Sequence, residues 1–436
     1  MKKVMITGIG MLCASGNGKD EAWANVKAGK PGITRITRFD PSRCTSQVAG
    51  EVKNFKEYAI DSGLVDRREA RHMALFSQYA VAASVEAWKD AGFKLKSQVE
   101  VEGSGGSPDM DRVGVLIGNG IGGLDVCGDN YKALFDRGPD RVSPLAIPEL
   151  ITNEAAGNVS IALGTKGPAQ VVTTACASST DALGFALDMI RAGRADVMVA
   201  GGTEAAVLEF AVGGFMKMKA LSTSYNDTPE TACRPFTKGR DGFVIGEGAA
   251  VLILESEEHA KARGARVYAE LAGYGATSDA YHITAPDPSG EGAVKAIEIA
   301  LKDAGVTDKS TVDYINAHGT STHLNDQMET KAFKTVFGEE GAKKINVSST
   351  KSMHGHLLGA TGALEAAITA LAIKDSFVPP TINYDVPDLE VDAAKGEVPL
   401  DLNYTPNVGV AREIRVALSS SLGFGGHNGI LVLKKV

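Results

Sequence analysis

Short runs of β-branched and aliphatic residues alternate with helical stretches along most of the chain, and this alternation constrains the fold most strongly. Strands that alternate with helices in this way indicate an α/β fold with mostly parallel sheets. The runs predict buried strands at 4–7, 113–117, 170–174, 197–200, 249–254, 313–316 and 345–348. The periodic stretches predict helices at 73–91, 179–192, 292–304 and 357–373.

Two segments suggest where the chain is divided. A charged stretch at 255–266 follows the expected strand 249–254, and we place a boundary there, giving halves 1–256 and 257–436. The Gly- and Ser-rich residues 101–109 are expected to form a surface loop. The N-terminus superficially resembles a secretory leader, but its apolar run breaks at Thr7, Gly8 and Gly10. We therefore expect a first strand at 4–7 that ends in a glycine turn.

Composition excludes several classes of protein. Lys and Arg number 45 against 53 Asp and Glu, a net charge of −8, which argues against a general nucleic-acid or membrane-surface binder. No apolar run approaches the ~20 residues that a membrane span needs. The odd number of five cysteines, with no CxxC pair, argues against a disulfide framework or a structural zinc site and favours a cytoplasmic location. One of the five is a candidate catalytic thiol.

Cys176 is that candidate, because it stands where an expected strand turns into a helix. The sequence 171–180 runs from a β-branched segment through Cys176 into a stretch with helical periodicity. A cysteine at this place lies beside the free N–H groups of the helix, whose positive end favours a thiolate. The layout parallels the nucleophile elbow of hydrolases, with sulfur in place of oxygen. A small buried hydrophobic cysteine is the competing interpretation.

Histidines, a lysine and a carboxylate follow in two further motifs. His318 begins a polar turn at the end of the expected strand 313–316. Lys351 and His356 lie in a turn before a helix that is apolar all round, which predicts a buried helix. Glu365 is the carboxylate within that helix, and a buried carboxylate needs a cationic partner, for which Lys351 is our candidate.

The last motif is the loop 419–428, where three glycines surround Phe424. Such a loop can turn its backbone N–H groups towards a ligand, or it can simply join two strands. Two weaker patterns compete with these motifs. Gly118 to Gly123 fits a dinucleotide fingerprint, although no helix pattern opens cleanly behind it. The histidines at 318, 323, 354 and 356, with carboxylates at 326 and 329, could suggest a metal site, but no HExxH-type spacing exists.

Together the four motifs closely resemble the β-ketoacyl-acyl carrier protein synthases, condensing enzymes of the thiolase superfamily, and above all their elongating type. The resemblance extends from 4–10 through 234–236 and 240–248 to 423–426. It implies a thiolase-like five-layered αβαβα fold made of two similar halves. Residues 1–256 would carry the nucleophilic cysteine, and residues 257–436 the His, Lys and Gly-Phe-Gly-Gly motifs.

The resemblance also implies an acyltransferase reaction. Cys176 would take the acyl chain from acyl carrier protein, with the N–H groups of Cys176 and Phe424 as oxyanion hole. His318 and His356 would stabilise the enolate formed when malonyl-acyl carrier protein loses CO₂. Attack of that enolate on the Cys-bound acyl group would extend the chain by two carbons in fatty acid biosynthesis. The family uses no cofactor or metal, because its substrates arrive on the phosphopantetheine of the carrier.

Further residues are assigned by the same resemblance. Lys351 would orient the two histidines with support from Glu365, and Phe424 would also gate malonyl entry. The positions implied for substrate binding are Ile121, Thr320, Thr322 and Leu422. The basic residues implied for carrier-protein docking are Arg67, Arg68, Arg71 and Lys219. We interpret the three arginines as one face of a helix, because they are spaced at i, i+3 and i+4.

Some choices stay open at this stage. Family members are homodimers, or heterodimers when paired with a chain-length factor. Ser179 and Leu422 depart from the commonest residues of the elongating type, so a ketosynthase of a type II polyketide or polyene pathway is the alternative function. A binding module without catalysis on the same fold is a third hypothesis. A Cys176 no more reactive than the other cysteines would support it.

Overall fold

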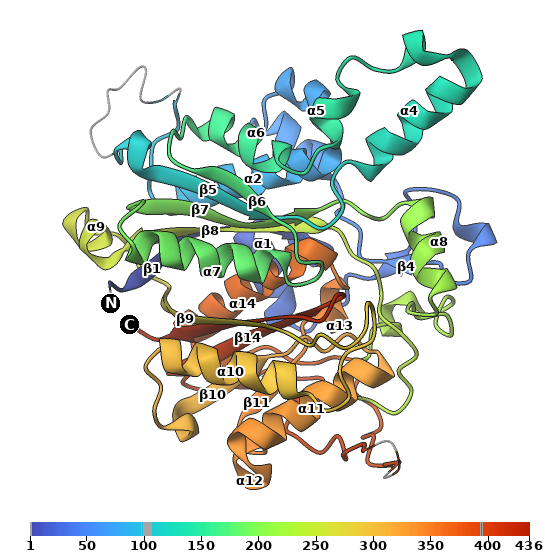
Figure 1. The fold of residues 1–436 in the computed structure, drawn as a ribbon, viewed down its shortest axis with the longest axis vertical. Coiled ribbons are helices and arrows are strands. Elements are labelled where there is room, and N and C mark those ends of the chain that lie inside the picture. Colours follow the sequence, from blue (N-terminus) through green and yellow to red (C-terminus); the bar gives the residue numbers. More distant parts are fainter. Residues whose placement is uncertain (1, 97, 99–106, 393, 395) are drawn as a thin grey trace.

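A computed structural model describes residues 2–96, 98, 107–392, 394 and 396–436 (Figure 1). Part of the expected loop, residues 101–106, lies outside this range. Among the described residues, eleven strands form one mixed sheet system in the order β11-β10-β14-β15-β9-β1-β8-β7-β5-β6, with β2 (Gly16–Asn17) paired to β1. Two small two-stranded sheets lie outside it. One pairs β3 (Thr34–Arg35) with β4 (Val48–Ala49), and the other pairs β12 (Phe377–Val378) with β13 (Val410–Ala411).

The sheet system consists of two strand sets with the same internal order. The N-terminal strand set is β1 (Val4–Cys13), β5 (Val113–Gly118), β6 (Ala169–Val172), β7 (Val197–Glu204) and β8 (Gly248–Ser256). The C-terminal strand set is β9 (Ala269–Ser278), β10 (Val312–Asn316), β11 (Asn346–Ser348), β14 (Val416–Gly423) and β15 (His427–Lys434). When the strands are numbered within each set, both sets follow the order 3-2-4-5-1. Strands 3, 2 and 4 are parallel to one another, and strand 5 is antiparallel to both of its neighbours. Residues 4–6 of β1 pair with 269–271 of β9 and join the sets.

Helices complete five layers, in agreement with the expected αβαβα architecture (Figure 1). Helix α2 (Leu75–Asp90) covers the outer face of the N-terminal strand set, and α10 (Glu291–Asp303) covers that of the C-terminal strand set. Between the two sets lie α7 (Ser178–Arg191) and α14 (Thr361–Asp375). The remaining α-helices of the described residues are α1 (Lys19–Lys27), α4 (Leu124–Arg137), α5 (Ala146–Leu150), α6 (Glu154–Leu163), α8 (Glu209–Lys217), α9 (Glu257–Ala262), α11 (His323–Phe337), α12 (Glu339–Ala342) and α13 (Lys351–His354).

Helix α14 shows why the sequence pattern predicts its place. Every residue from Thr361 to Ile373 is buried, as expected for a helix that is apolar all round. It packs on both strand sets and on α7, so it has no solvent-facing side. The middle layer therefore carries the two helices whose N-termini begin next to Cys176 and His356.

Several expectations about the strands are wrong. The glycine turn at Gly8 and Gly10 does not form, because β1 continues to Cys13. The glycines instead let α2 lie directly on the strand: a Cβ on Gly10 would be 2.0 Å from the carbonyl oxygen of Ala83. Strand β8 is antiparallel to both neighbours, although a parallel strand was expected at 249–254. No strand was expected at β9, β14 or β15. Small and polar residues conceal the pattern in β9 and β14, whereas β15 was missed despite its aliphatic residues 430–433.

Candidate active site

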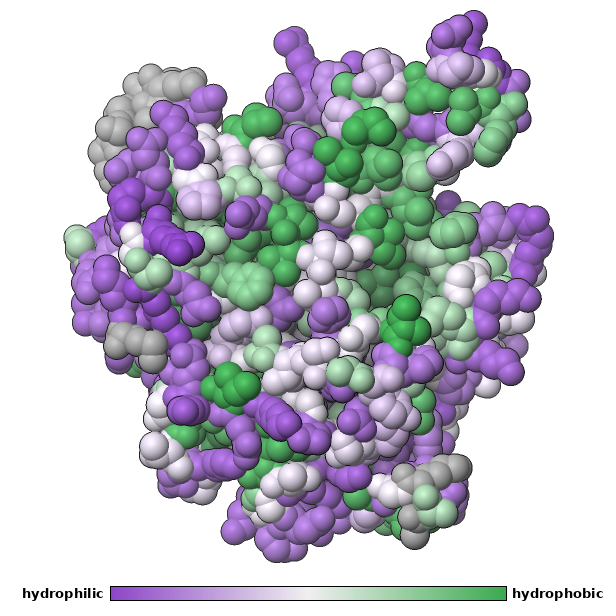
Figure 2. Space-filling view, viewed as in Figure 1, coloured by the Kyte–Doolittle hydropathy of each residue, from purple (hydrophilic) through white to green (hydrophobic). Residues whose placement is uncertain are grey.

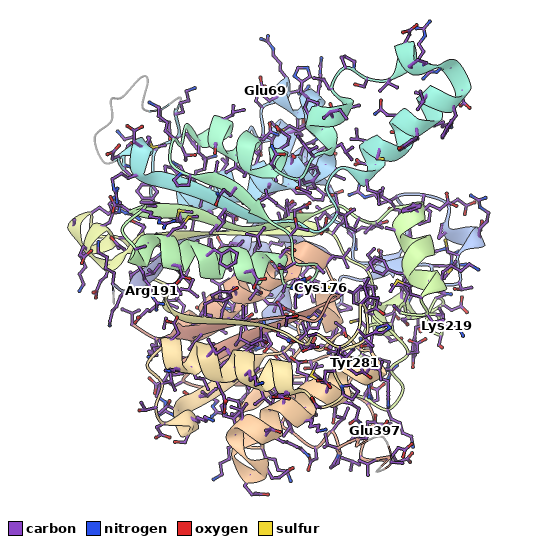
Figure 3. All side chains as sticks on the ribbon, viewed as in Figure 1. Glu69, Cys176, Arg191, Lys219, Tyr281 and Glu397 are labelled. Atoms are coloured by element: carbon purple, nitrogen blue, oxygen red, sulfur yellow. The ribbon has the colours of Figure 1, made fainter. Side chains whose placement is uncertain are left out.

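The candidate catalytic side chains all follow the carboxyl ends of parallel strands. Cys176 follows β6, His318 follows β10, Lys351 and His356 follow β11, and Phe424 follows β14. Ligand sites in open α/β sheets lie at such strand ends. Figure 3 shows Cys176 in the middle of the molecule, between the two strand sets. Residues from distant parts of the sequence are thereby brought to one place.

Cys176 occupies the expected turn between strand and helix. Ala175 directly before it has a φ of 50°, a left-handed conformation that a sharp elbow requires. Burial nevertheless raises the pKa of the Cys176 thiol to about 12, although Lys351 and the N–H groups of Phe424 and Cys176 oppose the shift. Desolvation thus outweighs the groups that favour a thiolate at this place. The thiol needs a proton acceptor before it can attack.

His356 is placed where it could be that acceptor. Its Nε2 lies 3.0 Å from Cys176 Sγ, and its Nδ1 lies 2.9 Å from Thr361 Oγ1. If Nδ1–H donates to the threonine, Nε2 is free to accept the proton of the thiol. The ring of His318 stands edge-on to that of His356 with centroids 5.3 Å apart. Burial, followed by the charge of Lys351, lowers the pKa of both histidines well below the ordinary value, so both rings are neutral at pH 7.

Lys351 and Glu365 form the expected pair. Lys351 Nζ lies 2.6 Å from Glu365 Oε1 and 2.5 Å from the carbonyl oxygen of His318, and both side chains are fully buried. Burial raises the pKa of Glu365, whereas the contact with the Lys351 ammonium lowers it. Lys351 thus connects Glu365 of helix α14 to the backbone carbonyl of His318.

Phe424 lies in the turn between β14 and β15, so this loop joins two strands and also reaches the cysteine. Its backbone N–H lowers the pKa of the Cys176 thiol, which places the N–H group next to the sulfur. A Cβ on Gly423 would lie 3.2 Å from the N atom of Cys176, so a side chain there would press against the elbow. Two backbone N–H groups, those of Cys176 and Phe424, therefore face the space beside the sulfur.

These groups open into one cavity of about 520 Å³. Its lining includes Cys176, His318, His356 and Phe424, together with all four residues expected to bind substrate: Ile121, Thr320, Thr322 and Leu422. The hydroxyls of Thr320 and Thr322 lie 2.9 Å apart. Lys219 also lines the cavity and is exposed, in a left-handed conformation just after α8.

The three arginines are exposed, but they do not form one face of a helix. Only residues 69–72 form a single 3-10 turn; Arg68 stands before it, and Arg67 pairs with Asp61 at 2.6 Å. The turn lies at the top of the view in Figure 3, where Glu69 is labelled, well away from Lys219 beside the cavity. The i, i+3 and i+4 spacing was insufficient to predict a helix here. Asp66 accepts the N–H groups of residues 68 and 69 and thereby starts a tighter turn.

The sequence motifs missed three residues that hold the site. Glu329 accepts the N–H groups of His318 at 2.7 Å and of Gly319 at 2.8 Å, so it fixes the turn rather than binding a metal. Thr361 orients His356, and Glu204 bonds to the backbone of the cavity wall. All three are buried polar residues, within helices or at a strand end. The spacing of residues in the sequence does not show that they are buried, so the motifs could not identify them.

The glycine-rich pattern at 118–123 bonds within the protein. A helix, α4, does open directly after Gly123, contrary to expectation. However, the N–H groups of Gly120 and Ile121 are already bonded to the Glu204 carboxylate, so they are not free for a phosphate. Of the residues that the structure describes, no group of three or more His, Cys, Asp or Glu side chains could hold a metal ion. In the same residues, no helix is long and apolar enough to cross a membrane.

Comparisons with known proteins agree with this geometry. Residues 1–260 match the beta-ketoacyl synthase N-terminal domain, and residues 268–385 match the C-terminal domain. The chain is 50% identical over 434 residues to 3-oxoacyl-[acyl-carrier-protein] synthase 2 of Staphylococcus aureus, covering 100% of this chain and 98% of that protein. The chain therefore belongs to the β-ketoacyl synthase family, whose members are acyltransferases with a thiolase-like fold.

Two solved structures are also similar over their full length. One is a type II polyketide synthase acyl-carrier protein in complex with its ketosynthase, with a TM-score of 0.85, 35% identity and 100% coverage of both chains. The other is the ishigamide ketosynthase/chain length factor, with a TM-score of 0.88, 33% identity and coverage of 100% and 99%. The identity to the 3-oxoacyl synthase is thus higher than that to either of these solved ketosynthases.

Proposed function

We propose that this chain is a β-ketoacyl-acyl carrier protein synthase that extends acyl chains by two carbons in fatty acid biosynthesis. The observation that carries the proposal is the contact between His356 Nε2 and Cys176 Sγ inside a cavity that also holds His318 and the N–H group of Phe424. A nucleophile, a proton acceptor, an anion-stabilising histidine and an oxyanion hole are the groups that decarboxylative condensation needs.

The first half-reaction transfers the acyl chain. His356 accepts the thiol proton as Cys176 Sγ attacks the thioester carbonyl, and the N–H groups of Cys176 and Phe424 stabilise the oxyanion. The carbonyl re-forms, the carrier leaves as a thiolate that takes up the proton from His356, and the acyl chain stays on the cysteine. Ile121 and Leu422 line the cavity next to this chain and contribute to the choice of its length.

The second half-reaction forms the carbon–carbon bond. Thr320 and Thr322 hold the phosphopantetheine of malonyl-acyl carrier protein, and Phe424 gates its entry. The bond to the carboxylate breaks, CO₂ leaves, and its electron pair forms an enolate whose oxygen accepts hydrogen bonds from Nε2–H of His318 and of His356. In this half-reaction the Thr361 hydroxyl donates to His356 Nδ1, so that His356 Nε2 carries the proton. Because both rings are uncharged, they donate hydrogen bonds without protonating the carbanion. The carbanion attacks the acyl carbonyl, and Cys176 leaves as a thiolate.

A direct test is to supply acyl- and malonyl-acyl carrier protein and to measure CO₂, β-ketoacyl product and the mass of the acylated chain. Cys176→Ala should lose the acyl adduct and the product. His318→Ala should keep the adduct and lose decarboxylation. A Cys176→Ala variant that still condenses acyl chains at the normal rate would refute the covalent mechanism, and an unreactive Cys176 would favour a binding module.

Acyl carrier protein is the proposed partner. Carrier proteins are acidic, and a local basic surface on an acidic enzyme steers such a partner. Arg67, Arg68, Arg71 and Lys219 are exposed and positively charged, and the solved ketosynthase complex supports a carrier as occupant. Charge reversal at Lys219 should raise the KM for acyl carrier protein and leave that for a short pantetheine thioester unchanged.

A homodimer is the proposed assembly. Strand β6 ends the sheet, and its outer edge pairs with no other described strand. Beside it, α4, α5 and α6 expose Phe135, Ile147 and Ile161 by 79%, 63% and 65%; Figure 2 shows apolar residues gathered in this upper region. An exposed edge and an apolar patch together favour a second copy as cover. Ile161→Glu with Phe135→Glu should give a monomer in light scattering.

The alternative is a polyketide ketosynthase that pairs with a chain-length factor, as in the ishigamide structure. The higher identity to the 3-oxoacyl synthase does not favour it. We further propose that the enzyme needs no cofactor or metal, since proton acceptor and oxyanion donors come from the chain itself, and that it acts in the cytoplasm, where its five unpaired cysteines stay reduced. Full activity after dialysis against a chelator would support the first point, and its loss would refute it.

A further inference from the structure

Glu204 is a buried carboxylate that the proposed reaction does not use. It ends strand β7 and is 0% exposed. Among the described residues it forms no ion pair, so no cation compensates its charge. Burial raises its pKa to about 7, and only neutral N–H groups oppose this shift. An unpaired buried carboxylate is costly to keep, so a role for it in holding the surrounding backbone has to be considered.

Four donors converge on this carboxylate. Oε2 accepts the N–H groups of Gly120 at 2.9 Å and of Gly359 at 3.1 Å. Oε1 accepts the N–H group of Ile121 and the side-chain amide of Asn119, both at 3.2 Å. Residues 119–121 follow β5 of the N-terminal strand set, whereas Gly359 comes three residues after His356. The carboxylate thus ties together two segments that are far apart in the sequence.

The glycines confirm that this contact shapes the cavity wall. A Cβ on either Gly120 or Gly359 would lie 2.8 Å from Glu204 Oε2, so a side chain at either place would displace the carboxylate. The two glycines also approach each other, since the Gly359 Cβ would be 2.5 Å from the Gly120 N atom. Gly120, Ile121 and Gly359 all line the cavity that contains Cys176.

We propose that Glu204 is a positioning residue that sets the acyl-chain length accepted by the cavity, by clamping the Gly120–Ile121 backbone against Gly359. This inference rests on the proposed function, because it concerns the acyl group held by Cys176. The clamp places the side chain of Ile121 in the wall. It acts on the wall of the cavity and not on the reacting atoms.

The uncharged amide of Glu204→Gln makes the prediction specific. A carboxylate accepts hydrogen bonds at both oxygens, whereas a glutamine has one acceptor and one donor. Its NH₂ group would face at least one backbone N–H, and the two donors would repel each other. The wall would then move into the cavity, which obstructs long acyl chains before short ones.

The test compares hexanoyl- and myristoyl-acyl carrier protein as acyl donors to Cys176, followed by intact mass. For Glu204→Gln we expect the myristoyl kcat/KM to fall about tenfold relative to the hexanoyl value, the loss expected for one buried hydrogen bond replaced by an unsatisfied group. Glu204→Asp keeps the charge and should retain more of the myristoyl rate. Glu255→Gln is the matched control, since Glu255 is equally buried and contacts Arg263. It lies near the end of β8, whereas Glu204 pairs with the start of that strand.

The outcomes separate the inference from the proposed function. A wild-type chain that is acylated, with an unchanged chain-length ratio in Glu204→Gln, would overturn the inference alone. Equal losses in the Gln and Asp variants, or the same change in Glu255→Gln, would assign the effect to packing or to general destabilisation and would overturn it too. If Glu204→Gln does not fold, the Asp variant decides. A fall in its ratio of myristoyl to hexanoyl kcat/KM would support the inference, and an unchanged ratio would overturn it. A wild-type chain that never acylates would refute the function itself.

Discussion

The buried pair Lys351–Glu365 offers the sharpest quantitative prediction. Its atoms are 2.6 Å apart with no exposed surface, and Lys351 also donates to the carbonyl oxygen of His318. The perturbations are Lys351→Met, Glu365→Leu and the double variant. Each single variant leaves one buried charge without its partner, whereas the double variant leaves no charge and only an unpaired carbonyl.

The magnitudes follow from the cost of neutralising the remaining group at pH 7. Deprotonating a lone lysine with an ordinary pKa of about 10.4 costs about 4.6 kcal/mol, so Glu365→Leu should be the most damaging. Protonating a lone glutamate with an ordinary pKa of about 4.3 costs about 3.7 kcal/mol in Lys351→Met. The double variant loses only the hydrogen bond to the His318 carbonyl, a cost of about 1–3 kcal/mol.

The assay is denaturant unfolding at one fixed protein concentration, because association shifts apparent stability. The double variant should be more stable than either single variant. Lys351→Met and the double variant should lose malonyl decarboxylation, because the carbonyl of His318 then lacks its Lys351 donor. A double variant less stable than both single variants would refute the reasoning, since it would show that the pair stabilises the fold by more than the charges cost to bury.

Other parts of the site give further predictions. Gly423→Ala should slow acylation of Cys176 about tenfold by pressing on the elbow, as small misplacements do; an unchanged rate in an acyl-transfer assay would contradict this. Thr361→Val should reduce alkylation of the cysteine by iodoacetamide, because His356 loses the partner that fixes its tautomer; Thr361→Ser is the control that should restore it. Burial lowers the pKa of His354 to about 3, so its labelled imidazole should stay neutral in NMR spectra down to pH 5, and protonation near pH 6 would show that the ring is solvated.

The sequence predicts which side chains meet at the cavity, whereas their catalytic roles stay predictions. Cys176 and His318 follow expected strands and Phe424 lies in an expected glycine loop, and all three line the cavity. The same patterns could not predict that burial would raise the pKa of Cys176, since desolvation depends on what packs around the sulfur. The helical face expected for Arg67, Arg68 and Arg71 is absent, because Asp66 accepts two backbone N–H groups and starts a tighter turn.

The missed strand β9 has an identifiable physical cause. Strand β9 contains Gly273 and Gly275, where a Cβ would lie 2.5 Å from Ala300 O and 2.2 Å from Ala296 O. These glycines let α10 lie on β9 just as Gly8 and Gly10 let α2 lie on β1. The first strand of each half therefore contains a glycine-x-glycine pair on which a helix packs, and this shared feature was a duplication signal that identity between the halves does not show.

The repeated strand order has a consequence for how the chemistry is divided. Position by position, the end of β6 that carries Cys176 corresponds to the end of β11 that carries Lys351 and His356, and the end of β7 with Glu204 corresponds to the end of β14 before Phe424. The same position in the strand order thus carries the proposed nucleophile in one half and its proposed proton acceptor in the other. Two copies of a single half would contain two thiols or two histidine turns, but not the pair. Condensation chemistry on this scaffold depends on the divergence of equivalent strand ends, and neither half contains a smaller version of the enzyme.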